Sequence, residues 1–114
     1  MYTYKAELIK VVDGDTVDLK VDMGFKTNKH ERFSVIGINA PELRGTEKHN
    51  GKLAKQFLID QLEGKPLLIK STKQGKYGRW LVSIRIDDSE TDPLKIIYIE
   101  ELMVENGHAV YKDY

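Results

Sequence analysis

Hydrophobic and polar residues alternate strictly over residues 16–22, where Val17, Leu19 and Val21 are separated by charged side chains. This period of two predicts a strand with one buried face and one face in solvent. Pro41 ends the third strand of the chain, because proline has no amide hydrogen to donate to a sheet. Further apolar runs predict strands over residues 4–12, 32–38, 66–70 and 80–86.

A second period, with apolar residues at spacings of one, three and four, predicts a helix over residues 50–62. Asn50 is placed to cap this helix, and Gly64 lies where a helix C-terminus favours glycine. A second, shorter helix is predicted over residues 99–106 and is closed by Gly107. The apolar stripe of the first helix consists of Leu53, Ala54, Phe57, Leu58 and Leu62. Polar or glycine-containing segments predict loops over residues 23–30, 43–50, 71–79 and 87–93.

The order of these elements is three strands, a helix, two strands and a helix. A five-stranded barrel with a helix between strands three and four is the oligonucleotide/oligosaccharide-binding (OB) fold, here followed by a C-terminal helix. Periodicity alone leaves a small α+β sheet protein as a near-equal alternative. Since the chain has 114 residues and contains no repeat or linker, we expect residues 1–114 to form a single domain.

The charge of the chain is balanced, with 18 basic and 18 acidic residues. This balance argues against a high-affinity, non-specific nucleic-acid binder, but not against an enzyme that holds a few phosphates locally. The chain has no cysteine, and therefore neither a disulfide nor a thiolate site. It has no apolar signal region and no run of membrane-spanning length, so we expect a cytoplasmic protein without a membrane partner. We also expect a monomer.

Two acidic turns are the first candidates for chemistry. Asp13 and Asp15 flank Gly14 between two strands, and an Asp-Gly pair there predicts a hairpin, because glycine accepts a positive φ. A surface turn is the simpler interpretation of this motif alone. The second turn, over residues 38–42, favours a functional site over a simple surface turn, because it adds further oxygen ligands and a carboxylate.

Hard cations such as Ca²⁺ bind carboxylates, amide oxygens, backbone carbonyls and water. Asp15 can supply a carboxylate, Asn39 an amide oxygen and Ala40 a backbone carbonyl, while Asp13 can ligate the ion or orient a bound water. Alternatively, Asp13 and Asn39 make only local turn hydrogen bonds. Glu42 follows a proline on a rigid turn, where a carboxylate can act as a general base, although an ordinary exposed glutamate is the competing interpretation. The two turns taken together favour a metal site.

A basic loop supplies the candidate phosphate contacts. Arg79 can donate two parallel hydrogen bonds to phosphate oxygens and neutralise charge that develops on phosphorus. Lys76 can bind a flanking phosphate, and Tyr77 can stack on a base or donate to a phosphate. A solvated basic turn is the common alternative for such a loop.

With these residues identified, the chain resembles the staphylococcal nuclease (thermonuclease) family. The motifs that carry the resemblance lie at residues 12–17, 38–42, 76–79 and 101–107. The resemblance implies an OB-fold barrel and Ca²⁺-dependent hydrolysis of DNA and RNA. By position, Asp15 matches a metal-ligating aspartate, Ala40 a carbonyl ligand, Glu42 the general base, Arg79 one of two catalytic arginines, Asp13 an acidic residue beside the metal, and Lys76 and Tyr77 contacts to a terminal phosphate.

The chain departs from the family pattern at two positions. Asn39 stands where the family usually has aspartate, which removes one negative charge and lowers the expected Ca²⁺ affinity. Ser34 stands where the family has its first catalytic arginine, so the predicted nuclease is weakened. Arg32 lies on the same face of the strand, about 7 Å away, and can contact substrate in its place. The alternative is a catalytically impaired module that binds nucleic acid or protein.

Overall fold

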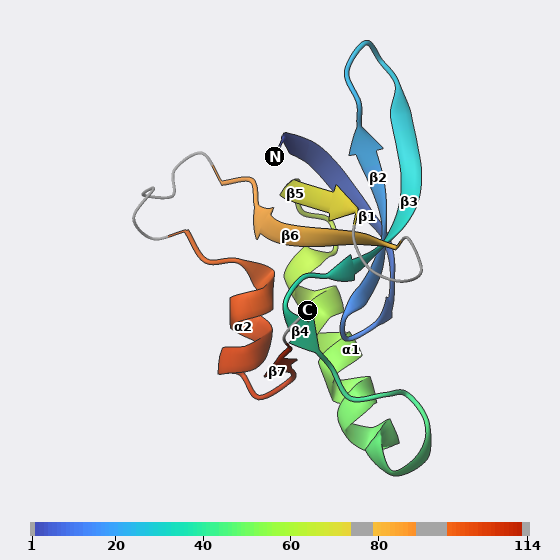
Figure 1. Cartoon of the computed structure of the whole chain (residues 1–114), viewed down its shortest axis with the longest axis vertical. Helices are drawn as coiled ribbons and strands as arrows, with labels where there is room; N and C mark the ends of the chain where they lie inside the picture. The colour runs from blue at the N-terminus through green and yellow to red at the C-terminus, as the bar shows by residue number, and fades with distance from the viewer. Residues whose placement is uncertain (1, 74–78, 89–95, 113–114) are drawn as a thin grey trace.

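Five strands close into a barrel in the order β1-β2-β3-β6-β5 (Figure 1). The structure is a computed structural model and describes residues 2–73, 79–88 and 96–112. Neighbouring strands of the barrel are antiparallel except β3 and β6, which are parallel. The barrel strands are β1 (Thr3–Asp13), β2 (Thr16–Asp22), β3 (Asn28–Val35), β5 (Leu67–Lys73) and β6 (Trp80–Ile86).

The barrel core is built from the alternation in the sequence. Val17, Leu19 and Val21 are buried, while the residues between them on β2 face outward. Inward-facing residues of the other strands fill the interior in the same way, so one face of each strand is buried away from water. The structure therefore confirms the five-stranded OB-fold barrel, and the open α+β sheet is wrong.

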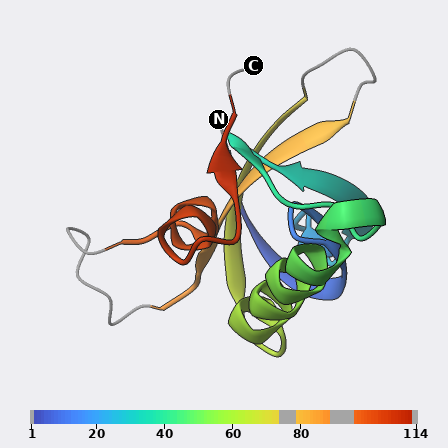
Figure 2. The same cartoon turned by 90° about the horizontal axis from the view of Figure 1, so that it is seen from below.

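Helix α1 (Lys48–Leu62) follows a short helix η1 (Gly45–Glu47) and lies between the third and fourth barrel strands in sequence. It lies at the end of the barrel where β1 and β2 are joined, with α2 (Ile99–Glu105) to one side (Figure 2). Ala54, Leu58 and Leu62 are its buried apolar residues. The described part of the chain has no helix that is both long and apolar enough to span a bilayer.

Helix ends are predicted well at the C-terminal side and less well at the N-terminal side. Gly64 and Gly107 follow α1 and α2 with φ of +70° and +75°, as the helix-terminating glycines predict. However, α1 begins at Lys48 and its N-cap is Glu47, so Asn50 lies inside the first turn and does not cap the helix. Leu53, assigned to the apolar stripe, is 47% exposed because the helix turns that position away from the barrel.

The predicted third strand, residues 32–38, is divided in the structure. β3 ends at Val35, Gly37 has a φ of +75°, and the chain resumes as the short strand β4 (Ile38–Asn39). β4 pairs with β7 (Val110–Tyr111), which the sequence did not predict, since pairing partners so far apart leave no local signal. Part of the predicted loop 23–30 belongs to β3, and β5 extends through residues assigned to the loop 71–79.

Candidate metal and phosphate site

The turn between β1 and β2 presents two carboxylates at one end of the barrel. Asp13 and Thr16 pair across the hairpin, which leaves Gly14 and Asp15 at the turn. The Asp13 Oδ1 accepts the Asp15 backbone N–H at 3.0 Å. The hairpin is therefore confirmed, and the local turn bond considered for Asp13 is present as well.

The reason for glycine in this turn differs from the prediction. Gly14 is not among the glycines with positive φ. A Cβ at this position would lie 2.7 Å from the Cβ of Ala40 and 2.8 Å from that of Ala54. Gly14 therefore allows close packing of the hairpin turn against the β4 loop and α1, and the positive-φ argument is wrong.

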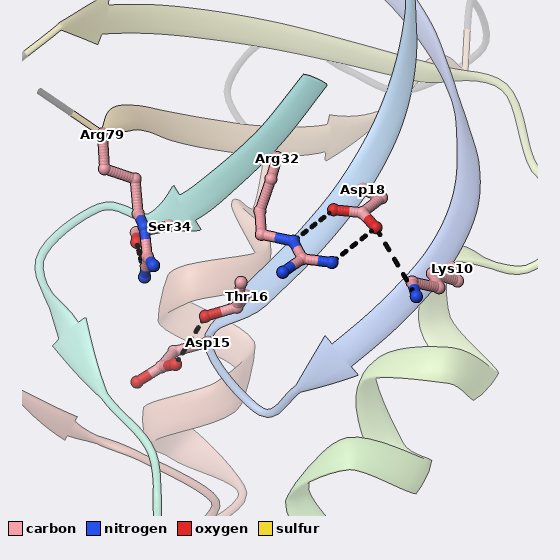
Figure 3. Close-up of polar contacts among 7 residues, drawn as sticks. All are labelled: Lys10, Asp15, Thr16, Asp18, Arg32, Ser34 and Arg79. Atoms are coloured by element: carbon pink, nitrogen blue, oxygen red, sulfur yellow. Dashed lines mark hydrogen bonds and ion pairs between the residues drawn. The ribbon is translucent and has the colours of Figure 1, made fainter. Parts of the chain in front are cut away.

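Asp15 connects the two acidic turns. Its Oδ2 accepts the Ala40 backbone N–H at 2.9 Å, and its Oδ1 accepts the Thr16 hydroxyl at 3.2 Å (Figure 3). The Asp15 carbonyl accepts the Val35 N–H at 2.8 Å. The first turn, the end of β3 and the start of the second turn are thus held together by one residue.

The electrostatics of Asp15 suit a cation. The pKa of the Asp15 carboxyl is raised to about 6, chiefly by burial and also by the neighbouring Asp13, while the bonds from Ala40 and Thr16 oppose the shift. A divalent cation at this position would stabilise both carboxylates in their charged form. Among the described residues no three His, Cys, Asp or Glu side chains gather into a metal site. A cation here would therefore need amide, carbonyl and water oxygens as well.

Asn39 and Ala40 are where such oxygens are available. Asn39 is the last residue of β4 and its side chain is exposed, whereas Ala40 is buried. The Ala40 backbone N–H is bonded to the Asp15 carboxylate, so the start of the second turn lies against Asp15. The chemistry of this set, two carboxylates, an amide and a backbone carbonyl, fits Ca²⁺.

Glu42 is exposed, and its backbone is held from two sides. Its N–H donates to the Glu47 carboxylate at 3.3 Å. On the other side, a Cβ at Gly51 would lie 2.2 Å from the Glu42 carbonyl oxygen, so only glycine in α1 allows this approach. Sequence reasoning missed Gly51, although a glycine inside a predicted helix is the kind of signal that marks close packing.

Arg79 lies immediately before β6 and reaches across to β3. Its Nη1 donates to the Ser34 hydroxyl at 3.4 Å. The parallel pairing of β3 with β6, in which Ser34 faces Leu81, brings these segments together. In Figure 3 the guanidinium ends beside Ser34 and points in the direction of Asp15. Arg79 is exposed and accessible to a phosphate.

Arg32 lies on the outer face of β3, as the alternation predicts, but its guanidinium has a partner. Its Nε and Nη2 donate to the two carboxylate oxygens of Asp18, at 2.8 and 3.2 Å (Figure 3). This hydrogen bond and the charge of Arg32 hold the pKa of Asp18 below its usual value, and Lys10 lies 4.0 Å from the same carboxylate. The pairing of Asp18 with Arg32 follows from the β2–β3 register and was not foreseen.

Two of the predicted contact residues, Lys76 and Tyr77, lie outside the described residues. Of the others, the structure brings Asp13, Asp15 and Ala40 together at one point. It places Arg79 against Ser34. Glu42 follows two residues after Ala40 on the same loop.

The chain belongs to the family described as staphylococcal nuclease homologues, whose sequence pattern matches residues 32–114. Asn39, Glu42 and Arg79 lie within the matched region, and the β1–β2 turn precedes it. The resemblance stated from the sequence motifs is thus confirmed at the level of the family.

Two curated relatives are similar over nearly the whole chain. An uncharacterized protein of Methanocaldococcus jannaschii is 29% identical over 93% of this chain and 58% of its own length. An uncharacterized protein of Bacillus anthracis is 27% identical over 95% of this chain and 47% of its own length. The chain thus spans about half the length of these curated relatives.

Proposed function

We propose that the protein is a Ca²⁺-dependent phosphodiesterase that hydrolyses DNA or RNA. The observation that carries this proposal is the bond from the Ala40 amide to the Asp15 carboxylate, which joins the two acidic turns of the family motif. A half-buried carboxylate with a raised pKa, beside a second carboxylate, is an arrangement that a cation would stabilise.

In this proposal Asp15, the Asn39 amide and the Ala40 carbonyl would hold Ca²⁺, and Asp13 would ligate it or orient a bound water. When bound, the ion would supply positive charge that polarises a phosphate of the substrate. The two turns position these oxygens before substrate arrives, because the Asp15 bonds fix the carboxylate relative to β4.

Glu42 accepts a proton from the attacking water, whose oxygen forms the new bond to phosphorus while the bond to the leaving sugar oxygen breaks. Arg79 donates hydrogen bonds to the non-bridging phosphate oxygens, where negative charge grows in the transition state. Arg32, Lys76 and Tyr77 contact neighbouring parts of the substrate.

Ser34 and Asn39 weaken this machinery. Serine gives Arg79 a hydroxyl neighbour where the family has a second cation, so less charge is neutralised in the transition state. Asparagine reduces the negative charge at the cation. These two positions favour the second candidate function, a nucleic-acid or protein-binding module without cleavage. Asp15, Glu42 and Arg79 favour the enzyme, because a binding module needs none of the three together.

The test is cleavage of single-stranded DNA and RNA by the purified protein, with millimolar Ca²⁺ or with chelator. We expect slow, Ca²⁺-dependent cleavage that is abolished in Arg79→Ala and reduced at least about a hundredfold in Glu42→Gln. Lys52→Ala, an exposed position on α1, is the matched control. A folded protein that binds oligonucleotide in a salt-dependent manner without cleaving it in any metal would overturn the enzyme in favour of the binding module.

A further inference from the structure

The turn between β2 and β3 has a backbone conformation that its residues disfavour. Phe25 and Lys26 have φ of +52° and +62°, and the Thr27 N–H donates to the Gly24 carbonyl at 2.9 Å. Positive φ at both central positions is the mark of a type I′ turn, which prefers asparagine followed by glycine. Bulky residues are rare in this region because the Cβ crowds the backbone.

Packing does not offset this strain. The Phe25 side chain is fully exposed, at 103%, so it gains no burial in return for its conformation. The β2–β3 hairpin extends beyond the other strands at the top of Figure 1, and the turn is its tip. A strained aromatic residue and a strained lysine side by side at a protruding tip point to a role in binding.

The outer face of the hairpin leads from the candidate site to this tip. Because the strand rises about 3.3 Å per residue, β2 covers about 20 Å between its ends. Of the acidic groups on this face, Asp18 is paired with Arg32, and Asp22 accepts the Gly24 N–H at 2.8 Å. From the candidate site outward, the cross-strand pairs are Thr16 with Ser34, Asp18 with Arg32, Lys20 with His30, and Asp22 with Asn28.

We infer that Phe25 and Lys26 bind single-stranded nucleic acid outside the cleavage site, an inference that rests on the proposed function. Phe25 stacks on an unpaired base, and Lys26 contacts a neighbouring phosphate. Alternation of an aromatic ring with cations is how proteins hold single strands without reading their sequence. A strand laid along β2, which is about 20 Å long, spans roughly six nucleotides at a stacked spacing of about 3.4 Å. The tip therefore binds long substrates and does not contact short ones.

Nucleic acid is favoured over a lipid surface or a second copy of the chain, because Lys20 lies on the outer face between the tip and the candidate site, followed by Arg32, whose guanidinium is paired with Asp18. A membrane would contact the tip alone, and Lys20 and Arg32 would then make no contact with it. Lys29, next to this face, is paired with Glu31 at 3.4 Å and is not needed for the contact.

The decisive variant replaces both tip residues with the sequence that the turn prefers, Phe25→Asn with Lys26→Gly. This change relieves the strain, so we expect the melting temperature to rise. At the same time the affinity for an oligonucleotide of about twelve nucleotides falls about tenfold, while that for one of about four nucleotides is unchanged. Binding is measured by fluorescence anisotropy in chelator, so that cleavage does not interfere.

The matched control is Leu53→Ala with Lys52→Ala, which removes an exposed apolar side chain and a lysine from α1. It should leave both affinities unchanged. Unchanged affinity of the tip variant for the long oligonucleotide overturns the inference, as does an equal loss for both lengths. Loss of vesicle binding or of self-association, with oligonucleotide binding intact, overturns it in favour of a lipid surface or a second copy.

The outcomes for the tip and for the proposed function are separable. If the wild-type protein binds the long oligonucleotide but never cleaves it, the proposed nuclease activity is overturned. The binding role of Phe25 and Lys26 is still supported if the tip variant loses affinity for the long oligonucleotide alone. If the wild-type protein cleaves, and the tip variant binds long and short strands as the wild type does, the proposed nuclease activity stands. The binding role of the tip is then overturned. A wild-type protein that binds neither strand overturns both.

Discussion

The guanidinium of Arg79 donates to the hydroxyl of Ser34, 3.4 Å away, across the parallel pair of β3 and β6. The sequence resemblance aligns Ser34 with an arginine of the family pattern, so a neutral side chain stands beside Arg79 where the resemblance implies a second cation. The hydroxyl gives the remaining arginine a neutral neighbour. Because the Ser34 hydroxyl contacts the Arg79 guanidinium, a longer side chain at position 34 starts from the same region.

Ser34→Arg is therefore expected to raise kcat for Ca²⁺-dependent cleavage by at least about tenfold, since a second phosphate clamp is added where charge develops. Single-turnover cleavage of a fluorescent oligonucleotide measures the change. Ser34→Ala removes the bond to Arg79 without adding charge and should not increase the rate. A folded Ser34→Arg protein no faster than the wild type would contradict the interpretation that Ser34 stands in place of a phosphate clamp.

Arg32 should affect binding more than chemistry. Its two bonds to Asp18 hold the guanidinium away from Arg79, so we expect Arg32→Ala to raise KM several-fold and to change kcat by less than about threefold. Asp18→Asn, which releases Arg32, should lower KM. The pair of variants is compared in steady-state kinetics at two salt concentrations. If Arg32→Ala instead reduces kcat as strongly as Arg79→Ala, Arg32 replaces the missing arginine directly.

We predict that Gly51 positions Glu42, the proposed general base, through the close approach of α1 to the Glu42 carbonyl. In Gly51→Ala the new Cβ must displace the Glu42 carbonyl, and a shift of about 1 Å at a catalytic group costs on the order of a hundredfold in rate. We expect kcat to fall by that order while the circular dichroism spectrum is retained. Lys52→Ala, the adjacent exposed position, is the control, and substrate affinity in chelator should be the same in both. Full activity of Gly51→Ala would mean that the Glu42 carbonyl position is irrelevant.

Glu100 gives a pH-dependent stability that is independent of the candidate site. Burial raises the pKa of Glu100 above its ordinary value of 4.5, although the Ser83 hydroxyl and the Ile84 N–H donate to it. The folded protein therefore binds this proton more tightly than the unfolded chain, so stability falls as pH rises above about 4.5. Glu100→Gln should increase the free energy of unfolding at about pH 7 and not below pH 4. Urea denaturation at both pH values tests this, and an equal effect at both would refute the pKa shift.

The elements that periodicity specifies were predictable. The β2 alternation and the stripe that contains Ala54, Leu58 and Leu62 give the barrel and α1, because burial selects residues at the period of each element. The four ordered motifs gave the family. The roles of Asp15, Asn39, Glu42 and Arg79 stay predictions, since a motif match defines positions and not activity.

The features that were missed depend on contacts between distant segments. Gly14 is required by the Cβ atoms of Ala40 and Ala54, which no local rule can anticipate. Tyr111 on β7 is 68% exposed, although aromatic side chains commonly pack in a core. Register likewise determines that Arg32 meets Asp18, and register is fixed only when β2 and β3 pair.

The pairing of β4 with β7 joins two segments that the ribosome synthesises at widely separated times. The β1–β2 and β2–β3 hairpins need only residues that leave the ribosome early, whereas β4 receives its strand partner only after Val110 and Tyr111 have been made. The backbone that carries Asn39 therefore acquires its strand partner later than the five barrel strands acquire theirs. A chain truncated before Val110 would carry all five barrel strands and still lack the strand that pairs with Asn39.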